Sequence, residues 1–467
     1  MKERKTFAGR WIQDFLGICN HELRQIFSDW GVMLIFFVAG LGYPILYNLI
    51  YLNGILNDTP IAVVDEAACS ESRDFIREID ATREVEVAYK CINIAEAQKL
   101  MQERKVKGIV LFPRDFGDRL ARMETATLSV YADMSSFLYY KNVLMSTNFV
   151  MLDKVRSIQI ERYGALGYTA QEASQLTQPL LYEENNPYNR AFSYNIFLVT
   201  AILLIMIQQT MFYGMSLLAG TQREKNHSFA SLPDRLSGHG VSRVVLGRGF
   251  AYWLVYMAVG LYIAFIVPAI FGLPQRGDFK DILLLLVFFV TDCVLFSETW
   301  SVIISRRETI FVLFLAISPI CLFLTGTSWP TVAFPGFWKY FSYLFPSTFG
   351  VQAFLNMNTA GGDLTSATTQ IFALSVQTIV YYFLAYATLS AENWVINHER
   401  ELAEVRQKID EKRRLDRKKY TGLISGGEAS PSPGGDIPIS EQCGVSRVSG
   451  SVGNDSSGEK LLHVFLV

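Results

Sequence analysis

Acidic and amide side chains stand inside long apolar runs of this sequence, where a charged group needs a partner or a function. Asp292 and Glu298 lie within one such run, and Gln208 and Gln209 lie within another. An aspartate at the centre of a membrane costs about 2.5–3.5 kcal/mol, so it needs a partner or a proton. The four residues could line a polar path, or they could join helices through hydrogen bonds that contribute about 0.6–2 kcal/mol each. Interhelical bonding is favoured for the glutamines, and both interpretations stay open for Asp292.

Residue patterns that would bind a nucleotide or perform catalysis are absent from the sequence. No GxxxxGK[ST] motif occurs, and the LGRG stretch at 246–249 lacks the lysine and hydroxyl residue that a phosphate loop requires. The five histidines form no HExxH or Cys/His spacing, and no GxSxG is present. We therefore expect a chain that is not an enzyme and that holds no metal and no cofactor of its own.

Two cysteines fall in the long segment between the first two apolar runs. Cys69 and Cys91 could form a disulfide in an oxidising compartment, or they could remain two buried free thiols. The sequence leaves both alternatives open.

Six apolar runs are long enough to serve as membrane spans, since a helix needs about 20 residues to cross the hydrocarbon core. Half of the residues are hydrophobic and 18% are charged, which indicates a mixture of membrane and aqueous parts. We predict spans over residues 30–52, 195–219, 249–273, 282–304, 309–325 and 370–390.

The orientation of these spans follows from lysine and arginine, which concentrate in cytoplasmic loops. The short segments predicted on one side carry 21 of them, and those on the other side carry three. Both termini are therefore predicted to be cytoplasmic. The start of the chain shows no signal-peptide cleavage pattern, so we expect the first span to remain as an anchor. The richer segments are 1–29, 221–248, 305–308 and 391–420.

The segments outside the spans differ in character. Residues 53–194 alternate strand-like and helix-like patterns, which predicts an α/β domain on the extracytoplasmic side. Residues 1–29 predict an amphipathic helix that lies in the interface or, alternatively, a plain cytoplasmic helix. Residues 393–420 predict a charged cytoplasmic helix, and 421–467 are rich in Gly, Ser and Pro, as in a disordered tail. The fold class is thus membrane α-helical, with six transmembrane helices and an α/β domain inserted between the first and second spans.

The stretch 326–350 is too broken for a span and too aromatic for an ordinary loop. Gly326, Trp329-Pro330, Pro335, Trp338 and Pro346 follow one another within it. This order resembles the Gly and repeated Pro pattern of type-2 ABC exporter permeases, in which short re-entrant helices form an outer gate. Proline starts or breaks short helices, and tryptophan anchors at membrane interfaces, which fits that comparison. An ordinary aromatic interfacial loop is the alternative.

The loop 221–248 is similar to the coupling loop of the same family, which contacts the ATPase. The resemblance implies that the charged and polar residues of this loop couple the chain to a nucleotide-binding partner. Ser228-Phe229 stands where the family commonly carries Gly-Thr. The residues implied are Arg223, Glu224, Lys225, Ser228, Asp234 and Arg235.

The resemblance covers residues 1–392, including the first span and, in 195–392, spans two to six with their loops. It implies the permease subunit of an ATP-driven exporter. It implies a cognate ATPase that binds ATP and Mg, a second permease copy or a paralogue, contact with membrane lipids, and a periplasmic adaptor as a further partner. It also implies the inner membrane of a bacterium, amphiphilic drugs or lipids as cargo, and no nucleic acid. The alternatives are a membrane-anchored receptor whose spans only support the outer domain, and a proton-driven carrier that uses Asp292.

Overall fold

The structure is a computed structural model. It describes residues 7–178, 180, 188–189, 193, 195–226, 240–304 and 306–425. The chain divides into two compact units, Met1–His398 and Glu399–Val467. The predicted disordered tail lies outside the described residues, apart from its first five, which are helical.

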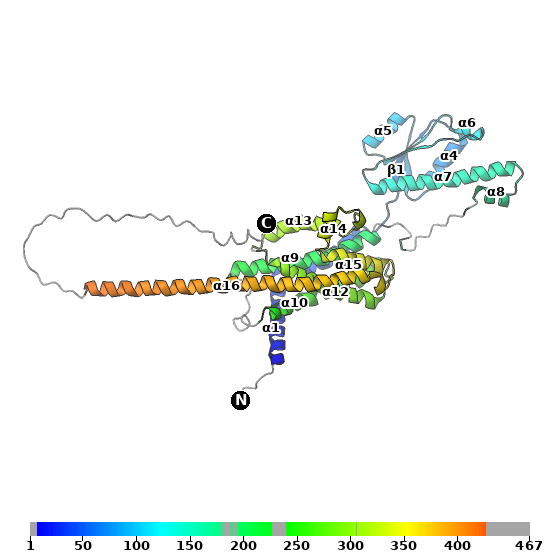
Figure 1. The fold of residues 1–467 in the computed structure, drawn as a ribbon. Coiled ribbons are helices and arrows are strands. Elements are labelled where there is room, and N and C mark those ends of the chain that lie inside the picture. The colour runs from blue at the N-terminus through cyan, green and yellow to red at the C-terminus, as the bar shows by residue number, and fades with distance from the viewer. Residues whose placement is uncertain are drawn as a thin grey trace, which may run out of the picture. The chain divides into compact units, whose positions relative to one another are not determined.

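The first unit contains a group of long helices at residues 7–50 and from residue 195 onward. A domain with a β-sheet lies between these two ranges in the sequence (Figure 1). The helix α1 spans Phe7–Ser28, and α2 (Trp30–Met33), a π-helical segment (Leu34–Ala39) and α3 (Gly40–Ile50) follow it. The remaining helices come after the sheet domain. They are α9 (Thr200–Asn226), preceded by a π-helical turn (Asn195–Val199), α10 (Val241–Leu261), continued by a π-helical turn (Tyr262–Ile266) and α11 (Val267–Phe271), α12 (Phe279–Ser301), α13 (Thr309–Leu324), α14 (Gly336–Ser342), α15 (Pro346–Phe354) and α16 (Thr368–Ser425).

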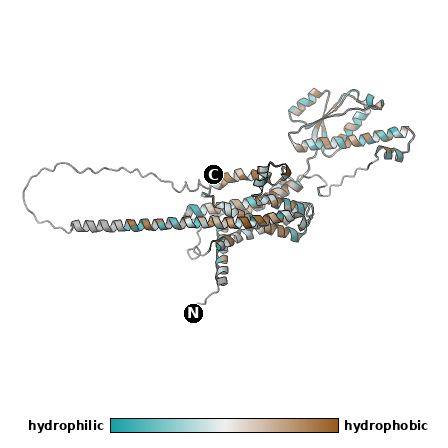
Figure 2. Cartoon of the chain, viewed as in Figure 1, coloured by the Kyte–Doolittle hydropathy of each residue, from teal (hydrophilic) through white to brown (hydrophobic). Residues whose placement is uncertain are grey.

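Four helical stretches in the described part of the chain are long and apolar enough to cross a membrane. They are Trp30–Ile50, Thr200–Glu224, Val241–Phe271 and Leu364–Val395. These match the predicted first, second, third and sixth spans. The predicted fourth and fifth spans lie on α12 and on α13, which is only 16 residues long. Apolar colouring is concentrated on this helical part in Figure 2.

Two helix boundaries differ from the sequence analysis. The predicted loop 221–248 is shorter, because α9 continues to Asn226 and α10 already begins at Val241. The predicted helix 393–420 is the continuation of the sixth span within α16. No Pro or Gly occurs between Thr368 and Tyr420, so nothing in the sequence interrupts helical hydrogen bonding there.

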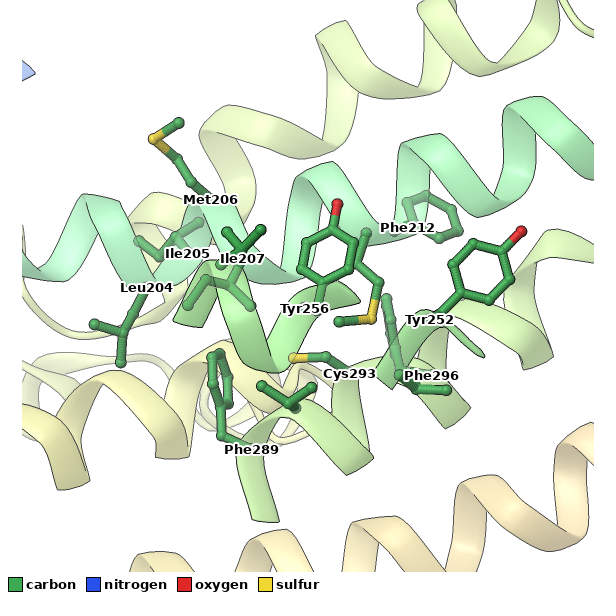
Figure 3. Close-up of a cluster of buried hydrophobic side chains, with 14 of the residues drawn as sticks. Leu204, Ile205, Met206, Ile207, Phe212, Tyr252, Tyr256, Phe289, Cys293 and Phe296 are labelled. Atoms are coloured by element: carbon green, nitrogen blue, oxygen red, sulfur yellow. The ribbon is translucent and has the colours of Figure 1, made fainter. Parts of the chain in front are cut away.

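The helical core is built mainly from α9, α10 and α12. Large side chains from these helices interlock around Tyr256, Phe289 and Cys293, which are fully buried (Figure 3). Glycines allow close approach at two places, since a Cβ on Gly214 would overlap the Phe36 ring and one on Gly350 would overlap the Phe289 ring. Small residues at helix contacts are the usual means of close packing in membrane bundles.

Gly214→Ala should destabilise the chain. The added methyl group meets the Phe36 ring across the contact between α9 and the first apolar helix, which we define as Trp30–Ile50. We expect a loss of about 1–3 kcal/mol, the usual cost of overpacking, measured as a lower melting temperature in detergent. Gly42→Ala is the matched control, since nothing lies within 4 Å of its Cβ position. Equal melting temperatures for the two variants would contradict the packing described.

The residues between α3 and α9 include a four-stranded sheet. Its order is β2-β1-β3-β4, with β1 parallel to both neighbours and β4 antiparallel to β3. The strands are β1 (Thr59–Asp65), β2 (Val85–Cys91), β3 (Gly108–Phe112) and β4 (Ser129–Ala132). The helices are α4 (Ser70–Asp80), α5 (Ile94–Gln102), α6 (Phe116–Ala121), α7 (Phe137–Ala165) and α8 (Ala170–Thr177).

Alternating residues of β1 pack on the two faces of the sheet. Ile61 and Val63 face α4, α6 and α7, whereas Ala62 and Val64 face α5. The helix α7 runs along the first face beside α4 (Figure 1). Helices thus cover both faces of the sheet, and α8 follows α7 in the chain.

The two cysteines of this domain are free, so the alternative of a disulfide is wrong for this structure. Cys69 packs with the α4 face of the sheet and Cys91 with the α5 face. The sheet itself therefore separates the two sulfur atoms. Burial raises the pKa of the Cys91 thiol, and the nearby Glu96 carboxylate adds to this effect.

Candidate functional site

A buried arginine joins the N-terminal helix to the apolar helices. Arg248 of α10 is 6% exposed, and its Nε donates to Glu22 Oε1 of α1 at 3.1 Å. The Tyr252 hydroxyl donates to the same carboxylate oxygen at 3.0 Å, and Arg248 Nη2 donates to Gln222 Oε1 at 3.2 Å. Three helices thus share one charged cluster, which we name the Arg248 cluster and define as Glu22, Gln222, Arg248 and Tyr252.

A second acid from α12 lies beside this cluster. Glu298 interacts electrostatically with Arg248, and its two carboxylate oxygens have no hydrogen-bond partner among the described residues. The Cβ position of Gly249 lies 3.7 Å from both oxygens, which places the carboxylate against α10 next to Arg248. No lysine or arginine lies inside the predicted spans, so none of them offers Glu298 a cation. Arg248 supplies one, since α10 begins well before the predicted third span.

The α1 helix is held along α10 by further contacts near this cluster. Arg243 Nη1 donates to Asp14 Oδ2 at 2.8 Å, and the Cβ position of Gly247 lies 3.1 Å from Ile18. Ile18, Glu22 and Ile26 are four residues apart and all buried, so they form the face that α1 turns toward the bundle. The predicted amphipathic helix therefore packs on protein along this face.

The end of α9 is fixed by the first two predicted coupling residues. Arg223 Nε donates to Glu392 Oε1 at 3.1 Å, and its guanidinium also donates to the Ser301 carbonyl at 2.8 Å and to the Ile304 carbonyl. Glu224 is exposed and accepts a hydrogen bond from the Arg307 amide at 2.9 Å. The Arg223 side chain thus packs against the end of α12 and against α16, while Glu224 contacts the connection between α12 and α13.

The other predicted coupling residues are not described. Ser228, Asp234 and Arg235 lie outside the described residues, as does the side chain of Lys225. From that set, the structure describes the side-chain contacts of Arg223 and Glu224.

The two glutamines of α9 bond to other helices, as the sequence analysis favoured. Gln208 Oε1 accepts from the Ser347 amide of α15 at 2.6 Å. Gln209 Nε2 donates to the Ser318 carbonyl of α13 at 3.1 Å, and the Ser318 hydroxyl donates to Gln209 Oε1 at 2.9 Å. Both side chains are buried, so these bonds satisfy amide groups that water cannot reach.

Asp292 has the most isolated position of the four polar residues. Its side chain is fully buried in α12, and neither carboxylate oxygen has a hydrogen-bond partner among the described residues. Asp292 precedes Cys293 in the sequence of α12. Phe289, Cys293 and Phe296 of this helix all belong to the apolar cluster of Figure 3. Tyr381 of α16 is its electrostatic neighbour, and that hydroxyl donates to the Leu344 carbonyl. A carboxylate in such surroundings demands a proton or a cation.

The stretch 326–350 forms short helices that begin at prolines, as predicted. Pro330 precedes a 3₁₀ turn (Thr331–Ala333), Pro335 precedes α14, and Pro346 is the first residue of α15. Gly326 ends the preceding apolar helix with φ of +83°, which only glycine adopts freely. Trp329 and Trp338 are 60% and 46% exposed, as interfacial anchors would be.

Comparison with known sequences decides the family. Residues 30–387 match the family described as ABC-2 family transporter protein. The chain belongs to the ABC-2 family. No curated protein matches it. As an ABC-2 protein it is a multi-pass membrane component of an ABC transporter, a transport subunit distinct from the ATPase that its family implies as a partner.

The ABC-2 match starts at residue 30, so α1 and Glu22 precede it. Local sequence patterns do not predict the Arg248 cluster, because Glu22 and Arg248 are 226 positions apart in the chain. One signal was available in this ABC-2 chain. Glu22 stands between Ile18 and Ile26 on the face of α1 that its spacing predicts to be apolar.

Proposed function

We propose that this ABC-2 protein is the permease subunit of an ATP-driven exporter that moves drug-like or lipid-like amphiphiles out of the cytoplasm or inner leaflet. It has six transmembrane helices, with α12 and α13 as the fourth and fifth, and both termini face the cytoplasm of a bacterial cell. The domain of residues 53–194 lies outside the cytoplasm. Two permease copies, or this chain and a paralogue, form the path together with a separate ATPase that binds ATP and Mg²⁺.

The observation that carries the proposal is the Arg248 cluster in a chain of this family. ATP binding closes the ATPase pair and displaces α1 and the segment between α9 and α10. Because Arg248 of α10 is bonded both to Glu22 of α1 and to Gln222 of α9, a displacement of α1 is passed to α10 and α9. The spans then rock between their access states, and the region 326–350 acts as the outer gate.

Affinity purification of the full chain from its native membrane, followed by mass spectrometry, tests this function. We expect a nucleotide-binding subunit to co-purify and the complex to show vanadate-sensitive ATPase activity. A chain that purifies alone under mild conditions, without ATPase activity, would overturn the exporter proposal and favour the anchored receptor.

Glu224→Ala should lower the stimulation of the partner ATPase while the chain stays folded. The carboxylate fixes the α9 end to the Arg307 amide, and without it the end of α9 loses one of its contacts with the connection between α12 and α13. We expect a loss of several fold in coupled ATPase activity, measured on the purified complex, with an unchanged melting temperature. Glu308→Ala is the control, because this acid is exposed on the same connection. Unchanged coupling in a folded Glu224→Ala complex would refute the role.

A further inference from the structure

The helix α7 has apolar residues on two faces, and only one of them packs on the sheet. Val143 and Val150 are buried in the sheet core. Met145 is 47% exposed and Phe149 is 73% exposed, although both lie in the middle of this 29-residue helix. A helix of a water-facing domain normally carries polar residues on its outer face, so the second apolar face needs an occupant.

This second face lines a groove of about 840 Å³ together with the chain that leaves the first apolar helix. Ile55 and Leu56 also line the groove, and Asn142 Nδ2 of α7 fixes this segment by donating to the Leu56 carbonyl at 2.8 Å and to Thr59 Oγ1 at 3.2 Å. The volume lies within the range of small-molecule sites, about 300–1,000 Å³. Ile50 and Tyr51, at the end of the first apolar helix, also line the groove.

Charged and polar side chains also line the groove. Lys141 and Glu84 interact electrostatically, and the Ser146 hydroxyl donates to Glu84 Oε2 at 3.5 Å. Partial burial lowers the pKa of Lys141, and Glu84 opposes that shift. The groove thus offers an apolar surface beside one cationic side chain, Lys141, and three acidic ones, Glu78, Glu84 and Asp153.

We propose that this groove binds a single-chain amphiphile, with its tail against Met145 and Phe149 and its charged head group beside Lys141 and Glu84. The mixed lining matches such a molecule, and a molecule held in a membrane reaches the groove past the end of the first apolar helix. A second protein copy would cover a broad surface, whereas this site is concave and has charges of both signs. The inference deepens the proposed function by placing a holding site for the same class of cargo outside the spans.

Photolabelling of the full chain in lipid nanodiscs tests the site. The probe is lysophosphatidylcholine with a diazirine in its acyl tail, and labelled peptides are mapped by mass spectrometry after irradiation. We expect labels to concentrate on the part of α7 between residues 138 and 150. Met145→Glu should reduce this labelling about tenfold, which corresponds to about 1.4 kcal/mol.

The controls separate binding from folding. Phe149→Ser removes a side chain that is 73% exposed, so it should reduce labelling without a loss of melting temperature. Ile92→Glu changes a residue that is 86% exposed and outside the groove lining, and it should label like the wild type. Equal labelling of all these variants, or labels spread evenly over the domain, would overturn the proposal. In a parallel experiment with a bifunctional cross-linking reagent, cross-links between two copies through α7 would also overturn it. No ATPase is needed, so a negative result leaves the exporter proposal to its own test.

Discussion

Arg248→Ala is expected to destabilise the chain by about 3–5 kcal/mol, the loss found when one partner of a buried ion pair is removed. The variant would leave Glu22, which is 3% exposed, and Glu298 buried without their cation. It would also remove the donors that hold α1 and α9 on α10. The melting temperature of the purified full chain in detergent is measured, with intrinsic fluorescence as the signal of unfolding.

Two companion variants make this prediction specific. Arg243→Ala breaks the ion pair with Asp14 on the same pair of helices, but those side chains are 16% and 29% exposed, so we expect a loss near 1 kcal/mol. The double variant Glu22→Leu/Arg248→Met removes both charges and should recover most of the stability lost in Arg248→Ala. A single Arg248→Ala variant that melts like Arg243→Ala would show that the cluster is solvated.

Asp292→Lys is expected to cost about 3–5 kcal/mol, whereas Asp292→Asn should cost about 1 kcal/mol. Asp292 is fully buried, and no hydrogen-bond partner is found for its carboxylate in the described part of the chain. A neutral amide of the same size fits that position, but a longer ammonium group would be a buried charge without compensation. Melting temperature and efflux of a fluorescent amphiphilic dye from cells are measured in parallel.

Asp292→Leu then separates a packing role from a transport role. Leucine matches the apolar surroundings, so this variant should melt at a higher temperature than the wild type. If the acid lines the path, dye efflux falls in the same variant. Wild-type efflux from Asp292→Lys and Asp292→Asn alike would show that the position is neither packed nor part of the path.

Local features of the sequence predicted the sheet domain well. The pattern of residues 70–80 predicts a helix with the bounds that α4 has. The patterns at 61–65, 85–89, 107–112 and 127–131 predict strands whose ends differ from the observed ones by two residues or fewer. These elements are specified by short-range periodicity, which a single sequence displays. The helix α8 was missed, although Thr169 and Glu172 form a capping box whose spacing is visible in the sequence.

The candidate site was much harder to predict, because it depends on residues distant in the sequence. Arg248 stands just before the predicted third span, where hydropathy suggests a solvated charge at the end of a loop. Only the tertiary structure shows that α1 supplies Glu22 and α12 supplies Glu298. By contrast, the glutamines of α9 were correctly favoured as interhelical donors and acceptors, since amides inside apolar runs have few other uses.

The Arg248 cluster also bears on how the chain is made. Ribosomes synthesise Glu22 first, Arg248 next and Glu298 last, so when α10 is made its arginine already has one acidic partner and α12 does not yet exist. A lone arginine would oppose entry of α10 into lipid, and Glu22 is the acidic partner that the chain already contains at that stage. The order of synthesis therefore makes the N-terminal helix available to Arg248 before α12, which carries Glu298, exists.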